Sequence, residues 1–221
     1  MTYAVSKTIE IEKIPVIDVK PLRAGTLENA YSVALEIRQA AEEIGFFYIR
    51  NHGVPESVIK QSYSAAKDFF NLPKVVKNNV KINSNHHGYL CFGEAKMEQA
   101  ESVDLKESFV WGLDLPDEHP SVTMENPFLG RNQWPVEIPE FKKSVYPFFE
   151  AGLQCGLDMM RAFALGMGLP EDSFLKATDE PIARSSIIHY PPQSEDLGEE
   201  QFGVAPHTDY GCLTLLWQDQ V

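Results

Sequence analysis

The chain has 221 residues, 43% of them hydrophobic and 11% aromatic, so it can bury a sizeable core as one domain or at most two. A formal net charge of -13, without any stripe of Lys and Arg, argues against a nucleic-acid partner. No apolar run approaches the roughly 20 residues that span a bilayer, and no signal peptide is evident, so we expect a soluble, cytoplasmic protein with no membrane partner. The three cysteines, Cys91, Cys155 and Cys212, lack metal-ligand spacing, and we expect them to be reduced.

The first fifty residues predict a strand, a helix and a second strand. Residues 14–18 form a short apolar run, and Thr26 is a plausible N-cap for the helix that follows. The helix ends at Gly45, where a C-cap glycine belongs. Its apolar stripe consists of Ala30, Ala34, Ile37, Ala41 and Ile44. Residues 46–49 are β-prone and lead into a turn at Asn51-His52-Gly53.

A second helix and two strand-like pieces are expected in the middle of the chain. Pro55 suits the first turn of the helix, and Leu72-Pro73 ends it. Its stripe consists of Ile59, Tyr63, Ala66 and Phe70. The pieces at 89–92 and 108–113 are strand-like, and residues 116–135 are interpreted as a long surface loop.

The last third begins with a helix and then becomes β-like. The helix is expected from near Pro147 to Gly168. Its stripe consists of Phe149, Leu153, Leu157, Met160, Ala164 and Met167. We expect a strand at 185–190, a polar loop at 191–201, and one long or broken strand at 204–217.

A histidine and an aspartate stand two residues apart at the start of the last predicted strand. Side chains in a strand alternate faces, so His207 and Asp209 should point to the same side. An imidazole and a carboxylate, completed by a second histidine, form the facial triad that leaves Fe(II) positions open. The bare tripeptide more often marks a turn or a strand end. The buried-strand pattern of residues 211–216 would place this pair beside apolar walls, where charges need a partner or a metal.

Three separated motifs carry a family resemblance. The run Pro-His-Thr-Asp-Tyr-Gly-Cys-Leu-Thr-Leu-Leu-Trp-Gln-Asp resembles the metal-binding strand of the isopenicillin N synthase-like family of Fe(II)/2-oxoglutarate-dependent dioxygenases. His189-Tyr190-Pro191-Pro192 is similar to the family's Tyr-Pro motif, and residues 14–18 and 45–55 are similar to its N-terminal region. The resemblance implies an α+β fold with N-terminal helices packed on a double-stranded β-helix (jelly-roll) core that is incomplete in this chain. Residues 1–135 would be the N-terminal region, and 136–221 a helix plus the first part of the jelly-roll domain.

The resemblance also implies roles for individual residues. His207 and Asp209 would be iron ligands and catalytic residues, and Tyr190 would donate a hydrogen bond to the co-substrate or the substrate, with ordinary packing as the alternative. Many relatives carry asparagine where this chain has Ile188, so inner contacts to the co-substrate would differ here. The implied cofactors are Fe(II) and 2-oxoglutarate, and the implied partners are dioxygen and a small-molecule substrate. Oxidative decarboxylation of 2-oxoglutarate would be coupled to hydroxylation or another C–H oxidation.

The remaining polar candidates are interpreted as structural. His189 should face away from Tyr190, and His52 should cap backbone groups in its turn. His86 and His87 are expected to be solvated loop residues. Lys106 and Glu107 are expected to form a solvated surface pair. The stretches at 87–92 and 109–113 match either walls of the family's substrate pocket or ordinary aromatic core.

Relatives supply a second iron-binding histidine several tens of residues after the His-x-Asp motif, and an Arg-x-Ser pair beyond it. The chain ends at Val221, so we expect a truncated polypeptide that is inactive by itself. Two alternatives stay open: an oxidase that needs no 2-oxoglutarate, and a non-catalytic metal-binding or interaction domain. A hydrolase is disfavoured because no G-x-S-x-G elbow is present. His207 and Asp209 do not distinguish hydroxylation from desaturation, ring closure or ethylene formation, and they do not identify the substrate.

Overall fold

The computed structural model describes residues 14–96, 103–123, 126, 128–178, 180–193, 203–205, 207–209 and 211–219. The chain forms two compact units. The first contains Met1–Val54 and Leu153–Pro181, and the second contains Pro55–Gly152 and Ile182–Val221. This spatial division differs from the predicted sequence boundary after residue 135, which stays a prediction. Within the described ranges, no helix combines the length and apolarity that a membrane crossing needs.

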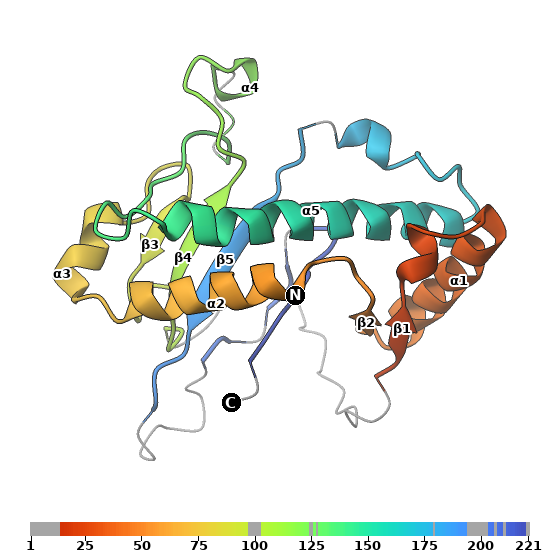
Figure 1. Cartoon of the computed structure of the whole chain (residues 1–221), viewed down its shortest axis with the longest axis horizontal. Helices are drawn as coiled ribbons and strands as arrows, with labels where there is room; N and C mark the ends of the chain where they lie inside the picture. Colours follow the sequence, from red (N-terminus) through yellow and green to blue (C-terminus); the bar gives the residue numbers. More distant parts are fainter. Residues whose placement is uncertain are drawn as a thin grey trace, which may run out of the picture. The chain divides into compact units, whose positions relative to one another are not determined.

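The first unit is built on a parallel pair of short strands joined by a helix (Figure 1). Strand β1 (Val16–Asp18) pairs with β2 (Tyr48–Arg50), with Ile17 opposite Ile49. Between them lie the short helix η2 (Lys20–Leu22) and α1 (Leu27–Glu43). As predicted, Thr26 caps α1, because its hydroxyl oxygen accepts a hydrogen bond from the backbone N–H of Asn29 at 3.2 Å.

The second half of α5 (Phe141–Gly166) packs against α1 within the first unit. Gly166 permits this approach, because a Cβ at that position would lie 2.8 Å from the carbonyl oxygen of Ala34. Arg38 holds the contact, donating from Nη1 to the carbonyl oxygen of Gly166 at 3.1 Å. A second short helix, η4 (Leu175–Ala177), follows α5. The unit is therefore closed by segments that lie more than a hundred residues apart in the sequence.

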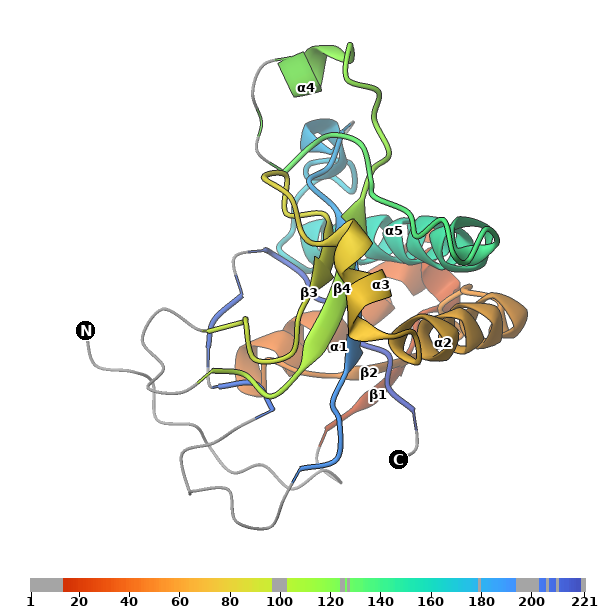
Figure 2. The same cartoon turned by 90° about the vertical axis from the view of Figure 1, so that its left-hand side faces the viewer.

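The second unit contains a three-stranded antiparallel sheet in the order β3-β4-β5. Strand β4 (Glu107–Gly112) is central and buried at every position. It pairs with β3 (Gly88–Leu90) and with β5 (Arg184–His189). Helix α2 (Glu56–Phe70) and the first turns of α5 lie along one face of this sheet in both views (Figures 1 and 2). The helices α3 (Lys74–Lys77), η3 (Asn78–Val80) and α4 (Pro120–Thr123) are short connections.

Aromatic side chains fill the space between these helices and the sheet. The rings of Phe69, Phe109 and Phe141 lie 5.0–5.2 Å apart in all three pairs, and all three are fully buried. Tyr89 and Trp111 extend the cluster along β3 and β4. Phe109, Val110 and Trp111 are buried. The first three residues of the stretch at 109–113 therefore belong to the core, which was one of the two interpretations of this stretch.

Two predicted helices differ from the structure in detail. Helix α5 begins at Phe141, six residues before the expected start near Pro147, because buried Phe141 and Val145 pack its first turns and override the proline inside it. Its buried stripe is Phe141, Val145, Phe149, Cys155, Met159, Ala162, Ala164 and Leu165. In α2, Ile59 and Ala66 are buried as predicted, but the fully buried aromatic residue is Phe69, and Phe70 is only half-buried.

The predicted strand at 204–217 is not formed by the described part of this segment. Residues 203–205, 207–209 and 211–219 contain bends and extended backbone without ladder pairing. A strand needs a neighbour to satisfy its backbone N–H and C=O groups, and no described strand pairs with this segment. Most of the predicted polar loop, residues 194–201, lies outside the described residues.

Candidate functional site

His207 and Asp209 face each other in the segment that follows β5. Nε2 of His207 lies 3.2 Å from Oδ1 of Asp209. Nδ1 of the same ring lies 2.8 Å from the carbonyl oxygen of Ala205, which can only accept, so Nδ1 carries the proton. The other carboxylate oxygen of Asp209 accepts from the hydroxyl of Thr214. The structure therefore brings the two predicted ligands together on one side.

The surroundings of this pair differ from the expectation. His207 and Asp209 are exposed, and so are Leu215 and Leu216, which the sequence pattern placed in a buried strand beside them. Because residues 211–219 are not covered by a paired strand, their apolar side chains have no layer to enter. Trp217 is partly covered, because its ring packs edge-on against the ring of Tyr63, with 5.5 Å between the ring centroids.

The donor atoms fit a metal such as Fe(II). Two ligands that bind one ion at a right angle, each at roughly 2.1 Å, lie about 3 Å apart. The 3.2 Å between Nε2 of His207 and Oδ1 of Asp209 agrees with that separation. Among the described residues, no group of three His, Cys, Asp or Glu side chains could hold a metal, so these two are a partial ligand set.

Tyr190 follows directly on β5 and is half-exposed. A Cβ at Gly203 would lie 2.9 Å from Cδ1 of Tyr190, so the tyrosine ring packs against the backbone just before Ala205. Burial, followed by the negative charge of Asp104, raises the pKa of the Tyr190 hydroxyl. The hydroxyl therefore stays protonated and able to donate a hydrogen bond. Its role toward a co-substrate stays a prediction.

Glu107 is buried, so the expected solvated pair with Lys106 is wrong. Its carboxylate accepts from Nζ of Lys77 at 2.7 Å and from the hydroxyl of Tyr89, and it lies 2.9 Å from Nδ1 of His189. These contacts join α3 and all three strands of the sheet. The physical reason for the error is that β4 is buried on both faces, so a charged residue at its start must be satisfied internally. His189 is structural, as predicted.

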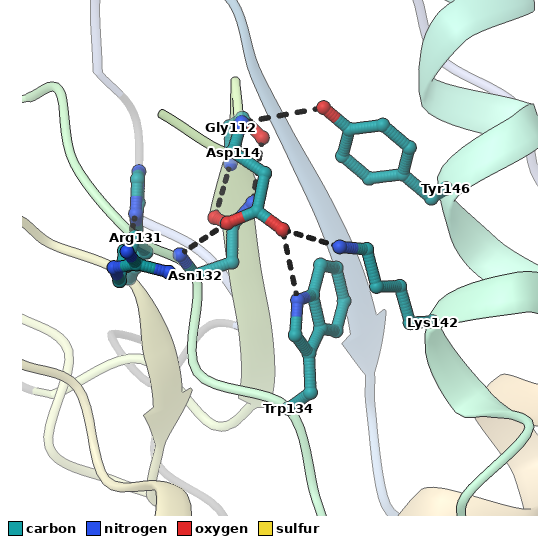
Figure 3. Close-up of polar contacts among 8 residues, drawn as sticks. Gly112, Asp114, Arg131, Asn132, Trp134, Lys142 and Tyr146 are labelled. Carbon is teal, nitrogen blue, oxygen red and sulfur yellow. Dashed lines mark hydrogen bonds and ion pairs between the residues drawn. The ribbon is translucent and has the colours of Figure 1, made fainter. Parts of the chain in front are cut away.

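Asp114 organises a second polar cluster just after β4 (Figure 3). Its Oδ1 accepts from the backbone N–H of Asn132 at 3.0 Å, and its Oδ2 accepts from Nε1 of Trp134 at 3.3 Å and Nζ of Lys142 at 2.5 Å. The hydroxyl of Tyr146 accepts from the backbone N–H of Asp114 at 3.2 Å. These polar groups are paired with one another. The cluster therefore fixes the loop before α5, and we assign it a structural role.

Of the predictions for the remaining histidines, those for His52 and His86 are confirmed, and the one for His87 is wrong. His52 caps its turn as predicted, because its Nδ1 accepts from the backbone N–H of Val54 at 3.2 Å. His86 is exposed, as predicted. His87 is fully buried, so the expectation of a solvated side chain is wrong. Its Nδ1 donates to the carbonyl oxygen of Arg131 at 3.3 Å, and the turn at residues 83–87 directs its ring toward Gly112 on β4.

Sequence reasoning missed Asp104, which is almost completely buried and contacts the segment of His207. Its Oδ1 accepts from the backbone N–H of Ala205 at 3.0 Å. One signal could have revealed it: the acidic residue stands directly before the charged and then apolar run of β4, where burial is expected. The cysteines are free, as predicted, and Cys91 and Cys155 are buried.

A cavity of about 370 Å³ lies in the first unit, beside the second half of α5. It is lined by Gln154, Leu157, Asp158, Arg161, Leu175 and Thr178. The two candidate ligands belong to the second unit. None of the residues that line this cavity is one of the predicted site residues His207, Asp209 and Tyr190.

Comparisons with known proteins agree on one family. Residues 14–137 match the model of the non-haem dioxygenase in morphine synthesis N-terminal family. A 2-oxoglutarate-dependent dioxygenase from Didymella fabae is 32% identical over 222 residues, covering 96% of this chain and 67% of that protein. The 2-oxoglutarate-Fe(II) type oxidoreductase hxnY from Emericella nidulans is 30% identical over 213 residues, covering 94% of this chain and 61% of that protein.

Solved structures give the same result. The crystal structure of a full-length Neurospora crassa protein in complex with alpha-KG has a TM-score of 0.72 and 27% identity, covering 90% of this chain and 61% of that chain. This chain spans between 60% and 67% of the length of three curated relatives that it matches. The family model covers more than half of the chain, and the similarity to the Didymella fabae protein extends over nearly all of it. The chain belongs to the family of non-haem, 2-oxoglutarate- and Fe(II)-dependent dioxygenases.

Proposed function

We propose that the full-length protein is an oxygenase that couples oxidative decarboxylation of 2-oxoglutarate to oxidation of a C–H bond in a small organic molecule. His207 and Asp209 supply two of its iron ligands, and dioxygen is the second co-substrate. The three-stranded sheet β3-β4-β5 is part of a jelly-roll core in this proposal. Family membership supports the reaction class, and the geometry of the pair supports the ligand assignment.

One observation carries the ligand assignment. The carbonyl of Ala205 accepts a hydrogen bond from Nδ1 of His207, so in the neutral form of the ring Nε2 presents a lone pair. That lone pair faces a carboxylate oxygen of Asp209 at 3.2 Å. Two acceptors at this distance repel each other unless a cation or a proton lies between them. A divalent metal between them relieves the repulsion, because Nε2 of His207 and Oδ1 of Asp209 can then both bind it as ligands.

The protein residues have separate tasks in this proposal. Asp209 would neutralise part of the metal charge, and Thr214 restrains its carboxylate by donating a hydrogen bond to Oδ2, while Oδ1 faces Nε2 of His207. The Tyr190 hydroxyl, which stays protonated, donates a hydrogen bond to a carboxylate of 2-oxoglutarate or to the substrate. Bound Fe(II) would activate dioxygen, with oxidative decarboxylation of 2-oxoglutarate supplying two of the four electrons that dioxygen takes up and the C–H bond supplying the other two.

The substrate is proposed only as a small molecule. The full-length Neurospora crassa protein was also crystallised in complex with alpha-KG and thymine. The alignment of that structure with this chain has 25% sequence identity. The complex concerns what the Neurospora crassa protein binds. For the present protein it supports a pocket of small-molecule size, without choosing between pyrimidines, small acids and secondary metabolites.

Anaerobic titration tests the proposal. Full-length protein with Fe(II) and 2-oxoglutarate should develop the weak visible charge-transfer band of the iron chelate. His207→Ala and Asp209→Ala should abolish the band, and His52→Ala should retain it, because His52 caps a turn in the first unit. If the wild type and all three variants absorb alike, the ligand assignment fails.

Succinate release distinguishes the proposal from an oxidase that needs no 2-oxoglutarate. This alternative has one specific support: relatives at 28% identity include 1-aminocyclopropane-1-carboxylate oxidase from Dictyostelium discoideum, whose name does not mention 2-oxoglutarate. Substrate oxidation with stoichiometric succinate supports the dioxygenase, and oxidation without succinate supports the oxidase. Metal binding without oxidation across a broad substrate panel would favour a non-catalytic metal-binding protein.

A further inference from the structure

Asp104 is a buried carboxylate on the segment that leads into β4. Its side chain is only 1% exposed, and its own backbone N–H donates to the carbonyl of Ala95 at 2.8 Å. A buried charge is costly unless it is paired and hydrogen-bonded. Asp104 meets this requirement with two partners, Nζ of Lys106 at 3.0 Å from Oδ2 and the backbone N–H of Ala205 at 3.0 Å from Oδ1.

The second partner connects Asp104 to the candidate metal ligand. Ala205 is buried, and both of its backbone polar atoms are used. Its N–H donates to Asp104, and its C=O accepts from Nδ1 of His207 at 2.8 Å. The hydrogen bond between Asp104 and Ala205 joins residues 101 positions apart, and it connects the segment before β4 to the His-x-Asp segment. No ladder hydrogen bond holds the described part of that segment.

We propose that Asp104 is a positioning residue for the metal site: it anchors the backbone of Ala205, whose carbonyl holds the His207 ring in the Nδ1–H form with Nε2 directed at the metal. The inference rests on the proposed function, because it gives Nε2 of His207 a metal to bind. Asp104 does not touch the metal or the substrate in this scheme. It acts through the backbone of Ala205, whose carbonyl is the direct partner of the ligating histidine.

Lys106 and Glu107 have different relations to this anchor. Lys106 balances the charge of Asp104 at Oδ2, the oxygen that Ala205 does not use, so it should matter for stability more than for ligand geometry. Glu107 is a similarly buried carboxylate on the same segment, and its partners are Lys77, Tyr89 and His189. It therefore offers a matched control: a buried acid whose loss does not release Ala205.

Metal binding provides the first test, with Mn(II) as the probe and full-length protein as the sample. Asp104→Ala should weaken Mn(II) binding by about 10- to 100-fold, the range seen when outer partners of metal ligands are removed. Asp104→Asn keeps an acceptor oxygen for the Ala205 N–H and should restore most of the affinity. Glu107→Gln should bind Mn(II) like the wild type, even where it lowers the melting temperature.

The histidine tautomer provides a test that does not depend on metal. In metal-free protein at mildly alkaline pH, where histidine is neutral, nitrogen-15 spectra should show the proton of His207 on Nδ1. Asp104→Ala should shift His207 toward a mixture of both tautomers, and Glu107→Gln should leave it unchanged. If Asp104→Ala does not fold, Ala205→Pro removes the same hydrogen bond from the donor side. It should then lower the Mn(II) affinity and shift His207 toward a mixture of tautomers in the same way.

The outcomes separate this inference from the proposed function. Unchanged Mn(II) affinity and an unchanged His207 tautomer in a folded Asp104→Ala or Ala205→Pro variant would overturn the positioning role. Equal Mn(II) affinity of wild type and His207→Ala would instead overturn the ligand assignment. A loss of affinity in Asp104→Asn as large as in Asp104→Ala would also count against positioning, because it would mean that the charge and not the hydrogen bond matters.

Discussion

Lys77 and Glu107 form an ion pair with Nζ 2.7 Å from Oε2, and both side chains are almost completely buried. The pair joins α3 to the central strand of the sheet. The hydroxyl of Tyr89 and Nδ1 of His189 complete the shell around the carboxylate. Each of these three partners of Glu107 comes from a different element, so this single acid fixes α3, β3, β4 and β5 to one another.

Removing the cation from this pair should strongly destabilise the fold. Lys77→Met keeps the length of the side chain but leaves the buried Glu107 charge without its lysine partner. We expect the free energy of unfolding to fall by about 3–5 kcal/mol, measured by urea denaturation at neutral pH. Lys60→Met removes the exposed pair with Glu56 and is the control, for which we expect no resolved change. Equal effects of the two substitutions would contradict the role of the buried pair.

The Glu107 cluster should also make stability depend on pH. Burial alone raises the pKa of Glu107, but hydrogen bonds from Lys77, Tyr89 and His189 outweigh it and hold the pKa below its ordinary value of 4.5. The folded state therefore binds this proton less readily than the unfolded state. The contribution to stability is complete above pH 4.5 and is lost as the pH falls below it. Glu107→Gln should flatten this part of the acid unfolding profile, and an unchanged profile would contradict the assignment.

His87 should lower the free energy of unfolding as the pH falls below 6.5, a range that lies above the one in which Glu107 acts. Burial lowers its pKa from the ordinary 6.5, while the backbone carbonyl of Arg131 opposes that shift and Arg184 adds to it. The unfolded state is thus protonated before the folded state, so stability is lost as the pH falls below 6.5. His87→Gln should remove this slope from the pH dependence of the urea midpoint. The neighbouring exposed His86 is the control, because His86→Gln should keep the slope.

Asp114 should contribute more to stability than its neighbour Asp117. Burial raises the pKa of Asp114, but its hydrogen bonds from Lys142, Asn132 and Trp134 outweigh that effect and lower it. Asp114→Ala should cost about 2–3 kcal/mol, because it leaves the partly buried N–H donors of Asn132 and Trp134 without their acceptor. Asp117 forms an exposed ion pair with Arg131, so Asp117→Ala should leave the melting temperature unchanged. A similar loss in both variants would argue against the cluster.

Tyr190 can be tested by removing only its hydroxyl. If Tyr190 donates to a carboxylate of 2-oxoglutarate, Tyr190→Phe should raise the Kd for 2-oxoglutarate by about 10-fold, since hydrogen bonds to charged groups contribute about 1.5–3 kcal/mol and this side chain is half-exposed. The turnover rate at saturating 2-oxoglutarate should change little. Tyr31→Phe, on the exposed side of α1, is the control. An unchanged Kd would leave Tyr190 as a packing residue against Gly203.

The sequence alone determined the order and type of most elements and the candidate ligands. Local signals were enough for α1, because Thr26 and Gly45 mark its ends through capping geometry. They were also enough for β4 and β5, whose β-prone centres are Phe109-Val110-Trp111 and Ile187-Ile188. The spacing of His207 and Asp209 identified the pair that the structure brings to 3.2 Å.

Only the tertiary structure decided which polar residues are buried and what they contact. Glu107, His87 and Asp104 lie at the start of a strand, in a turn and just before a strand, and their burial depends on strands and loops that are distant in the chain. The same is true of the start of α5, where packing of Phe141 overrides the signal of Pro147. Segment 204–217 has strand-like composition, yet a strand also requires a partner, and pairing is a property of the whole fold and not of one segment.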